Sequence, residues 1–198
     1  MPSTVSAMSS AAHSAIVAGL ASTQRQLVST AASTPSSRSS SSGSATTLEA
    51  NTGAELAHAV RALFSSPYDG GAKLWLALRA LGLRREHAEL FGSGDYRPIE
   101  AAGARAKHVV AYARSREREG VIVVAGRLFA SLGLDPGVLP VGDAAWAGTT
   151  IDVGFLAPGT AMRNVLTGET VIVDGDRLPL ARACESFPGA LFVYERGA

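Results

Sequence analysis

Cysteine is almost absent from this chain of 198 residues, which contains only Cys184. A single thiol excludes an internal disulfide framework and suits a reducing compartment. Because no histidine or asparagine pattern accompanies it, we expect Cys184 to be a small buried residue rather than a reactive thiol. Histidine is also scarce, and the four residues are too scattered to give zinc-ligand spacing: His13, His58, His87 and His108. We therefore expect no metal site and no cofactor.

Long hydrophobic runs and an excess of charge are missing as well. The chain is 46% hydrophobic and 18% charged, yet no run reaches the ~18 to 20 apolar residues that a membrane-spanning helix needs. Without Met1–Thr47, the sequence carries 16 basic and 17 acidic residues, which gives no electrostatic reason to bind nucleic acid or a membrane surface. We expect a soluble, cytoplasmic protein.

Gly92-Ser-Gly94 lacks the lysine and hydroxyl residue of a phosphate-binding loop, so it predicts no nucleotide site.

Acidic residues are absent from Met1–Thr47, a segment with fifteen serines and two arginines. Such a composition cannot bury enough apolar surface to offset the entropy of ordering, so residues 1–47 are predicted to be disordered. Two other interpretations stay open. The segment resembles an organellar targeting peptide, although no basic residue precedes the apolar stretch Ala15–Ala21. It also resembles a shifted reading frame of a GC-rich gene, which the nucleotide sequence would decide.

Residues 48–92 are predicted to form a helical segment. Thr52 and Glu55 have the spacing of a capping box, and apolar residues at helical intervals predict a helix over about 53–65. Asp69 is expected to cap the next helix through its carboxylate, and Gly92 is expected to stop it.

The second helix is apolar on more than one side. Between Ala72 and Leu83, one face carries Leu74, Leu78 and Leu81, and another carries Leu76, Ala80 and Leu83. A helix of this kind is normally packed between two layers. The residues after it can supply one layer, but nothing before it is able to supply the other. We therefore expect the Ala72–Leu83 helix to associate with a further domain, with another chain or with a second copy.

Residues 93–198 are predicted to form a β domain, because the hydrophobic period changes to two after Gly94. Ala106–Arg114 alternates, Ser115–Gly120 turns, and Val121–Val124 returns as a strand buried on both faces. A short helix is expected at Arg127–Leu132. Further strands are expected at about 149–155, 161–166, 169–173, 177–180 and 190–195. The chain is thus predicted to be α+β, with an antiparallel β-sandwich.

Few residues in this region suggest chemistry. Asp174 and Asp176 are the only close acidic pair in a turn, and a hairpin turn explains them better than a metal or a catalytic dyad. Glycoside chemistry needs two carboxylates across a cleft, and no second member is identifiable. Trp146 is the candidate substrate-binding residue, because its indole ring could stack on a sugar ring. The alternative is that the Trp146 side chain covers the edge of the hydrophobic core. Trp75 is expected to pack, and Tyr96 fits either role.

Several motifs resemble the C-terminal region of malto-oligosyltrehalose synthase, the glucan glucosylmutase of the α-amylase family. The matching segments, in order and spacing, cover roughly residues 49–198. They are Asp69–Leu74, Ala80–His87, Glu89–Phe91, Gly94–Ile99, His108–Arg114, Trp146–Thr149, Arg163–Gly168 and Phe187–Leu191.

The resemblance implies an isomerase that converts the reducing-end α-1,4 bond of a maltodextrin into an α,α-1,1 bond, without cofactor or metal. The family's catalytic acids lie in a (β/α)₈ barrel before this region, so no catalytic residue carries over to this chain. The two helices predicted in residues 48–92 would correspond to the last helices of that barrel. We expect a truncated or frame-shifted copy, inactive alone, unless a separate barrel-bearing chain completes it. The alternative is a stand-alone α-glucan-binding or protein-interaction module.

Overall fold

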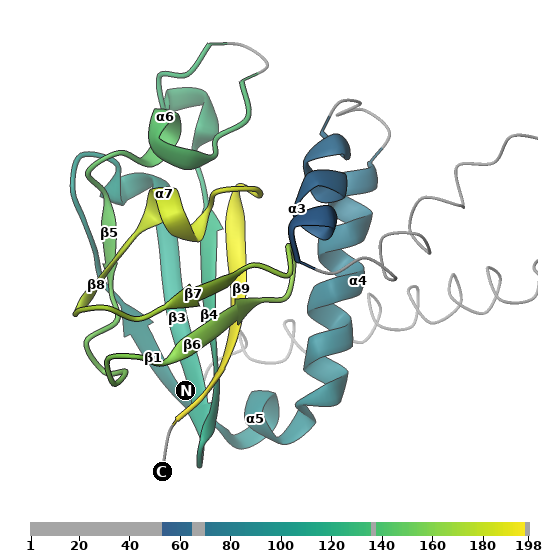
Figure 1. The fold of residues 1–198 in the computed structure, drawn as a ribbon, viewed down its shortest axis with the longest axis vertical. Coiled ribbons are helices and arrows are strands. Elements are labelled where there is room, and N and C mark those ends of the chain that lie inside the picture. The colour runs from purple at the N-terminus through teal and green to yellow at the C-terminus, as the bar shows by residue number, and fades with distance from the viewer. Residues whose placement is uncertain (1–52, 65–69, 136–137, 197–198) are drawn as a thin grey trace, which may run out of the picture. The chain divides into compact units, whose positions relative to one another are not determined.

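The computed structural model describes residues 53–64, 70–135 and 138–196, which all lie within one compact unit, Ser42–Ala198. Figure 1 shows how their helices and strands are arranged. The predicted disorder of residues 1–47 and the predicted caps at Thr52 and Asp69 lie outside the described residues. The domain boundaries near residues 48 and 93 stay predictions. In the described part of the chain, no helix is both long enough and apolar enough to cross a bilayer.

Three helices come first: α3 (Gly53–Ala62), α4 (Gly71–Glu86) and α5 (Ala88–Ser93). Both predicted helices are therefore present, but the second ends differently. Gly70, in the left-handed region at φ 75°, precedes α4 without a side-chain cap. The prediction that Gly92 stops the helix is wrong. The backbone leaves the helical conformation at His87, Gly92 lies inside α5, and Gly94 is the residue after which the chain becomes extended.

Six antiparallel strands form the larger sheet, in the order β1-β3-β4-β9-β6-β7. Their bounds are β1 Asp95–Ile99, β3 Val109–Arg116, β4 Glu119–Gly126, β9 Gly189–Glu195, β6 Ala161–Asn164 and β7 Thr170–Ile172. The β3–β4 hairpin pairs Arg116 with Glu119 across a two-residue turn, and Glu117 has a positive φ of 54°. That conformation is typical of tight hairpins.

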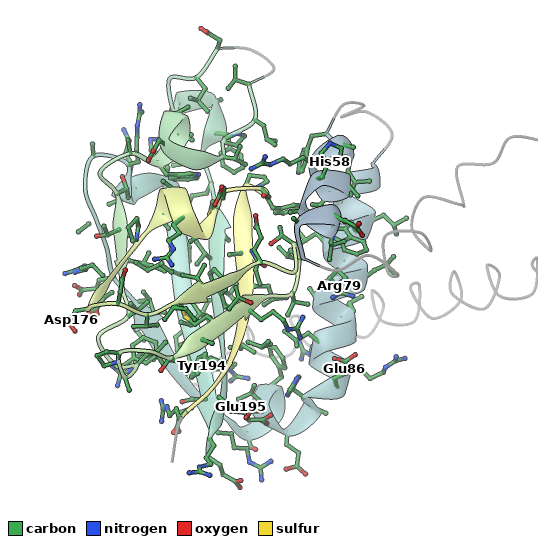
Figure 2. The ribbon with its side chains drawn as sticks, in the orientation of Figure 1. His58, Arg79, Glu86, Asp176, Tyr194 and Glu195 are labelled. Carbon is green, nitrogen blue, oxygen red and sulfur yellow. The ribbon has the colours of Figure 1, made fainter. Side chains whose placement is uncertain are left out.

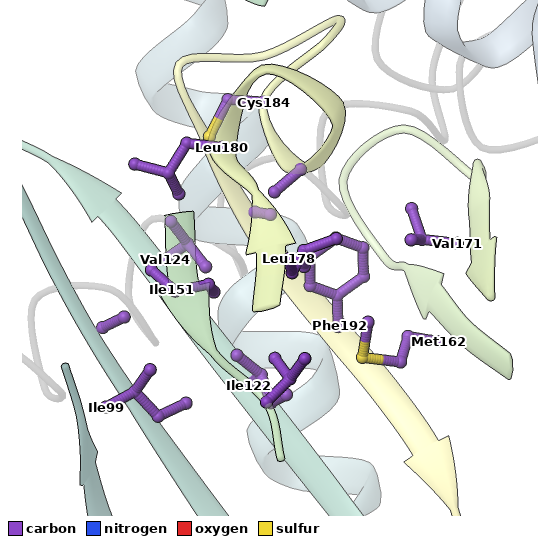
Figure 3. Close-up of a cluster of buried hydrophobic side chains, with 14 of the residues drawn as sticks. Ile99, Ile122, Val124, Ile151, Met162, Val171, Leu178, Leu180, Cys184 and Phe192 are labelled. Atoms are coloured by element: carbon purple, nitrogen blue, oxygen red, sulfur yellow. The ribbon is translucent and has the colours of Figure 1, made fainter. Parts of the chain in front are cut away.

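A second sheet of three strands contains β2 (Ala101–Ala102), β5 (Thr150–Asp152) and β8 (Arg177–Pro179). Its buried side chains join those of the larger sheet in one hydrophobic core (Figure 3). Ile122 and Phe192 come from the larger sheet, while Ile151 and Leu178 come from the smaller one. The predicted α+β class with an antiparallel β region is confirmed.

The opposite face of the larger sheet is covered by the helices. A second cluster joins Val60 of α3, Trp75 and Leu83 of α4 and Leu90 of α5 to Val121 of β4. Ile122 and Val124 of the same strand point into the first core. The prediction that Val121–Val124 is buried on both faces is therefore confirmed, apart from Val123, which is only partly buried.

Several short elements differ from the predictions. Strand β3 begins at Val109 because Ala106–His108 forms a 3₁₀ turn, η1, and another 3₁₀ turn, η2 (Phe129–Ser131), occupies the predicted helix Arg127–Leu132. Helix α6 (Gly142–Trp146) contains Trp146, and α7 (Leu180–Ala183) follows β8; neither was predicted. Strands β1 and β2 were not predicted. These elements are too short for a hydrophobic period to develop, so tertiary packing decides them.

Candidate functional site

Trp146, the predicted sugar contact, lies in the core. Its side chain is 0% exposed, and its indole Nε1 donates a hydrogen bond to the Pro140 carbonyl at 2.9 Å. Stacking on a sugar needs an open ring face. The geometry therefore favours the alternative that the sequence also allowed, a side chain that belongs to the core, and the substrate contact stays a prediction without an exposed surface to support it.

The acidic pair lies in the connection between β7 and β8. The predicted hairpin turn is wrong, because β7 pairs with β6 and β8 pairs with β5, so the connection crosses from one sheet to the other. Asp174 Oδ2 is 3.4 Å from Nη1 of Arg182, and the Asp176 carbonyl accepts a hydrogen bond from the Val153 N–H. In residues 53–196, apart from the gaps in the description, no group of three or more His, Cys, Asp or Glu side chains is placed to hold a metal. Asp174 therefore pairs with an arginine of α7, and the backbone of Asp176 joins the connection to Val153.

Cys184 is buried beside α7, as predicted. Burial raises the pKa of its thiol from 9.0 to about 12, because the thiolate would lose its hydration. The thiol therefore stays protonated at neutral pH, and it has none of the character of a nucleophile.

Helix α4 is fixed to the larger sheet by polar contacts as well as by packing. The buried Trp75 donates its Nε1 hydrogen to the Leu166 carbonyl at 3.0 Å. Arg79, one helical turn later, donates from Nε to the Val165 carbonyl at 3.0 Å. The Arg79 guanidinium also lies over the Trp75 ring, 5.2 Å from its centre. The predicted packing role of Trp75 is confirmed, and its partner is the backbone just after β6.

The other side of α4 is apolar and uncovered by any described residue. Leu74, Leu78 and Leu81, here called the leucine face, are between 41 and 53% exposed. They are the same three residues that the helical spacing placed on one face. Of the second predicted face, Leu83 is buried and Ala80 packs against the helix–sheet cluster, but Leu76 is 41% exposed. One layer is therefore the β domain, and the described residues contain no second layer.

An apolar groove of about 620 Å³ runs between α4 and the larger sheet, here called the α4 groove. Leu76 and Ala80 line it from the helix, Phe91 from α5, Tyr112 from β3 and Leu191 from β9. Among the described residues that line it, Lys73 and Arg84 are charged and none is a carboxylate. The groove therefore lacks the acids of a glycosidase site and has the character of a docking surface.

Charged side chains connect the end of α4 and helix α5 to the β3–β4 hairpin. His87 Nδ1 lies 2.9 Å from Glu119 Oε2, Glu89 of α5 pairs with Arg116, and the Arg114 guanidinium donates to the Phe91 carbonyl. Figure 2 shows Glu86 at the end of α4 on the same side as Glu195 of β9. These contacts fix α5, which contributes Phe91 to the lining of the α4 groove.

Sequence reasoning identified the leucine face but not the groove. The groove needs Phe91, Phe129 and Phe187 together, and these come from three separate parts of the chain. Helical spacing can place residues on one helix, but nothing in the sequence pairs them with aromatic residues so far away.

No protein-family model matches this chain. Two curated proteins from Mycobacterium tuberculosis, from the strains CDC 1551 and H37Rv, are named maltooligosyl trehalose synthase. Each is 40% identical to this chain over 90 residues. The match covers 44% of this chain and 11% of each relative, so the chain spans about a tenth of their length. The resemblance seen in the sequence motifs is confirmed as similarity over part of the chain.

Two solved structures overlap part of the fold. A variant of maltooligosyltrehalose synthase from Arthrobacter ramosus has a TM-score of 0.46 and 28% identity, over 69% of this chain and 17% of that one. A maltogenic α-amylase from Thermotoga neapolitana has a TM-score of 0.38 and 14% identity, over 57% of this chain and 23% of that one.

Proposed function

We propose that residues 48–198 are the C-terminal portion of a maltooligosyl trehalose synthase-like enzyme and that this portion is structural rather than catalytic. The similarity over 90 residues to proteins of that name supports the assignment. The substrate would be a maltodextrin, and the reaction would exchange its reducing-end α-1,4 bond for an α,α-1,1 bond in the cytoplasm. Because the chain spans 11% of these relatives, the catalytic acids would lie in a part of the enzyme that this chain lacks.

The observation that carries this proposal is the unequal burial of α4. Trp75 and Leu83 seal one side of the helix against the sheet, while the leucine face and the α4 groove are open. A monomeric domain rarely exposes an extended apolar surface without a use for it. We propose that a catalytic (β/α)₈ barrel, supplied by the remainder of the enzyme or by a separate chain, covers this surface.

The isolated chain is therefore expected to release no trehalose-ended product from maltopentaose, while the Mycobacterium tuberculosis relative serves as the active control. Product would be detected by chromatography after long incubation. Formation of the α,α-1,1 bond by the purified chain alone would overturn the structural role.

Docking is tested by complementation. The barrel portion of the Mycobacterium tuberculosis relative, lacking its own matched C-terminal portion, is mixed with this chain and examined for a stable complex by size-exclusion chromatography. Replacing the three residues of the leucine face by serine should abolish the complex. Ile172→Ser is the matched control, because Ile172 is an exposed apolar residue on β7 outside the α4 groove. Equal loss in both variants, or no complex with the unaltered chain, would contradict docking through α4.

The alternative, a stand-alone α-glucan-binding module, has a better surface at Tyr96 than at Trp146. Tyr96 is 59% exposed, and its ring centre lies 5.3 Å from that of Tyr112. Retention on amylose that is lost in Tyr96→Ala, and kept in a folded Trp146→Phe variant, would favour this module. No retention of the unaltered chain would exclude it.

A further inference from the structure

A second pocket lies away from the α4 groove, at the junction of the two sheets. It is open, has a volume of about 1020 Å³ and is here called the arginine pocket. Arg97 of β1, Arg177 of β8 and Arg196 after β9 line it, together with Asp152 of β5 and Asp176. Figure 2 shows Asp176 on the opposite side of the β domain from Arg79 in α4. The pocket therefore does not belong to the surface proposed for docking.

The arginines of this pocket are not neutralised by its aspartates. No ion pair within 4.0 Å joins any of the three arginines to either aspartate in the described part of the chain. The lining has one more positive than negative charge. Three guanidinium groups without carboxylate partners make a strong binding site for an anion, because each can donate two parallel hydrogen bonds to a phosphate or carboxylate.

Strand pairing and a local hydrogen bond fix the positions of charged residues that line the pocket. Asp152 and Arg177 are register partners in the β5–β8 pair, and Asp152 Oδ1 accepts a hydrogen bond from the Gly154 N–H at 2.9 Å. A Cβ atom at Gly154 would lie only 3.2 Å from Oδ1 of Asp176. The absence of a side chain at Gly154 therefore leaves room for the Asp176 carboxylate.

Arg97 and Phe155 line the pocket, and Tyr194 of the neighbouring core interacts with two of its arginines. The Arg97 guanidinium lies 5.0 Å from the centre of the Phe155 ring, an interaction that orients the charge. Burial raises the pKa of Tyr194, and the charges of Arg196 and Arg97 act in the opposite direction. The Tyr194 hydroxyl is buried and interacts with the Arg196 guanidinium, which helps to position that arginine.

We propose that the arginine pocket binds a small phosphorylated sugar. The arginines would contact the phosphate, while Asp152 and Asp176 would accept hydrogen bonds from the sugar hydroxyls. The pair of aspartates would weaken binding of a bare anion, so the pocket fits an anion that also carries hydroxyl donors. Its volume is at the upper end of that usual for small-molecule sites. This inference is independent of the docking of α4.

The test is calorimetric titration of the full chain with glucose 6-phosphate, inorganic phosphate and glucose at low salt. Glucose 6-phosphate should bind in a saturable manner and at least tenfold more tightly than phosphate, and glucose should not bind. Arg177→Ala should weaken the binding of glucose 6-phosphate at least tenfold. Arg163→Ala, which removes an exposed arginine of β6 outside the pocket, should leave it unchanged.

The variant Asp152→Asn tests the proposed role of the aspartates separately from that of the arginines. It should strengthen the binding of inorganic phosphate, because a nearby negative charge is removed, and it should reduce the preference for glucose 6-phosphate over phosphate. Circular dichroism would establish that each variant is folded. Absence of saturable binding, equal binding of glucose, or equal affinities for phosphate and glucose 6-phosphate in the unaltered chain would each overturn the proposal.

Discussion

At the scale of single residues, the two tryptophans illustrate why residue type does not determine role. Trp146 and Trp75 are both buried, and each satisfies its indole N–H with a backbone carbonyl. The first anchors α6 in the core between the sheets, and the second anchors α4 on the larger sheet. Aromatic residues suggest sugar binding only where a ring face is open, and Tyr96 meets that condition better than either tryptophan.

Trp75→Phe should lower the free energy of unfolding. The variant keeps an aromatic ring but leaves the Leu166 carbonyl without its indole donor and opens a small void. The lost hydrogen bond and the void together should cost about 1 to 3 kcal/mol. Urea unfolding followed by circular dichroism measures this. An unchanged midpoint would mean that the Trp75 contact does not hold α4.

Cys184 should react with iodoacetamide only when the chain unfolds. Burial raises the thiol pKa to about 12 in the folded state, from 9.0 in the unfolded state. The folded state therefore keeps a proton that the unfolded state loses above about pH 9, so this residue's contribution to stability falls as the pH rises from 9 towards 12. Cys184→Ala should reduce that decline. Rapid alkylation at neutral pH without denaturant would contradict the burial.

At the scale of elements, the junction from α4 through α5 to β1 decides where the helical layer ends. A Cβ atom at Gly94 would lie 2.4 Å from the Leu90 carbonyl oxygen, whereas nothing lies within 4 Å of a Cβ atom at Gly92. Gly94 is therefore required by the close approach of α5 to the start of β1. Gly92 is not required in this way, although the sequence predicted Gly92 as the residue that ends the helix.

Gly94→Ala should destabilise the protein by about 1 to 3 kcal/mol, because backbone atoms must move to admit the methyl group. Gly92→Ala is the matched control. Since Gly92 lies in a helix and its surroundings are open, alanine there should leave stability unchanged or raise it by roughly 0.5 to 1 kcal/mol. Thermal unfolding of both variants tests this, and the opposite order of stability would restore Gly92 as the helix stop.

At the scale of the whole molecule, the proposals concern two different surfaces of the described residues. The leucine face and the α4 groove are apolar, and the arginine pocket is polar and charged. The first surface fits a protein partner, and the second fits a small anionic ligand. Variants on one surface should therefore leave the other function intact, which makes the two proposals separable.

Without its partner, the chain should self-associate through the leucine face. Partial burial of each exposed leucine contributes about 1 kcal/mol, so the six leucines of two copies contribute about 6 kcal/mol, which favours weak association at high protein concentration. Sedimentation velocity should show a concentration-dependent mass, and the triple serine variant should shift towards the monomer. Ile172→Ser should not change the mass. A single monomeric species of the unaltered chain at all concentrations would contradict this expectation.

The sequence by itself determined the class of the fold and much of its order. Period-two segments predicted β3 to β9 closely, except that β3 begins later, because alternation reflects which face of a strand is buried. Helical spacing placed Leu74, Leu78 and Leu81 on one face, which the structure leaves exposed. Tertiary structure alone decided the break at His87, the burial of Trp146 and the assembly of the α4 groove and arginine pocket. Each of these depends on contacts between residues far apart in the chain, and such contacts leave no local period in the sequence.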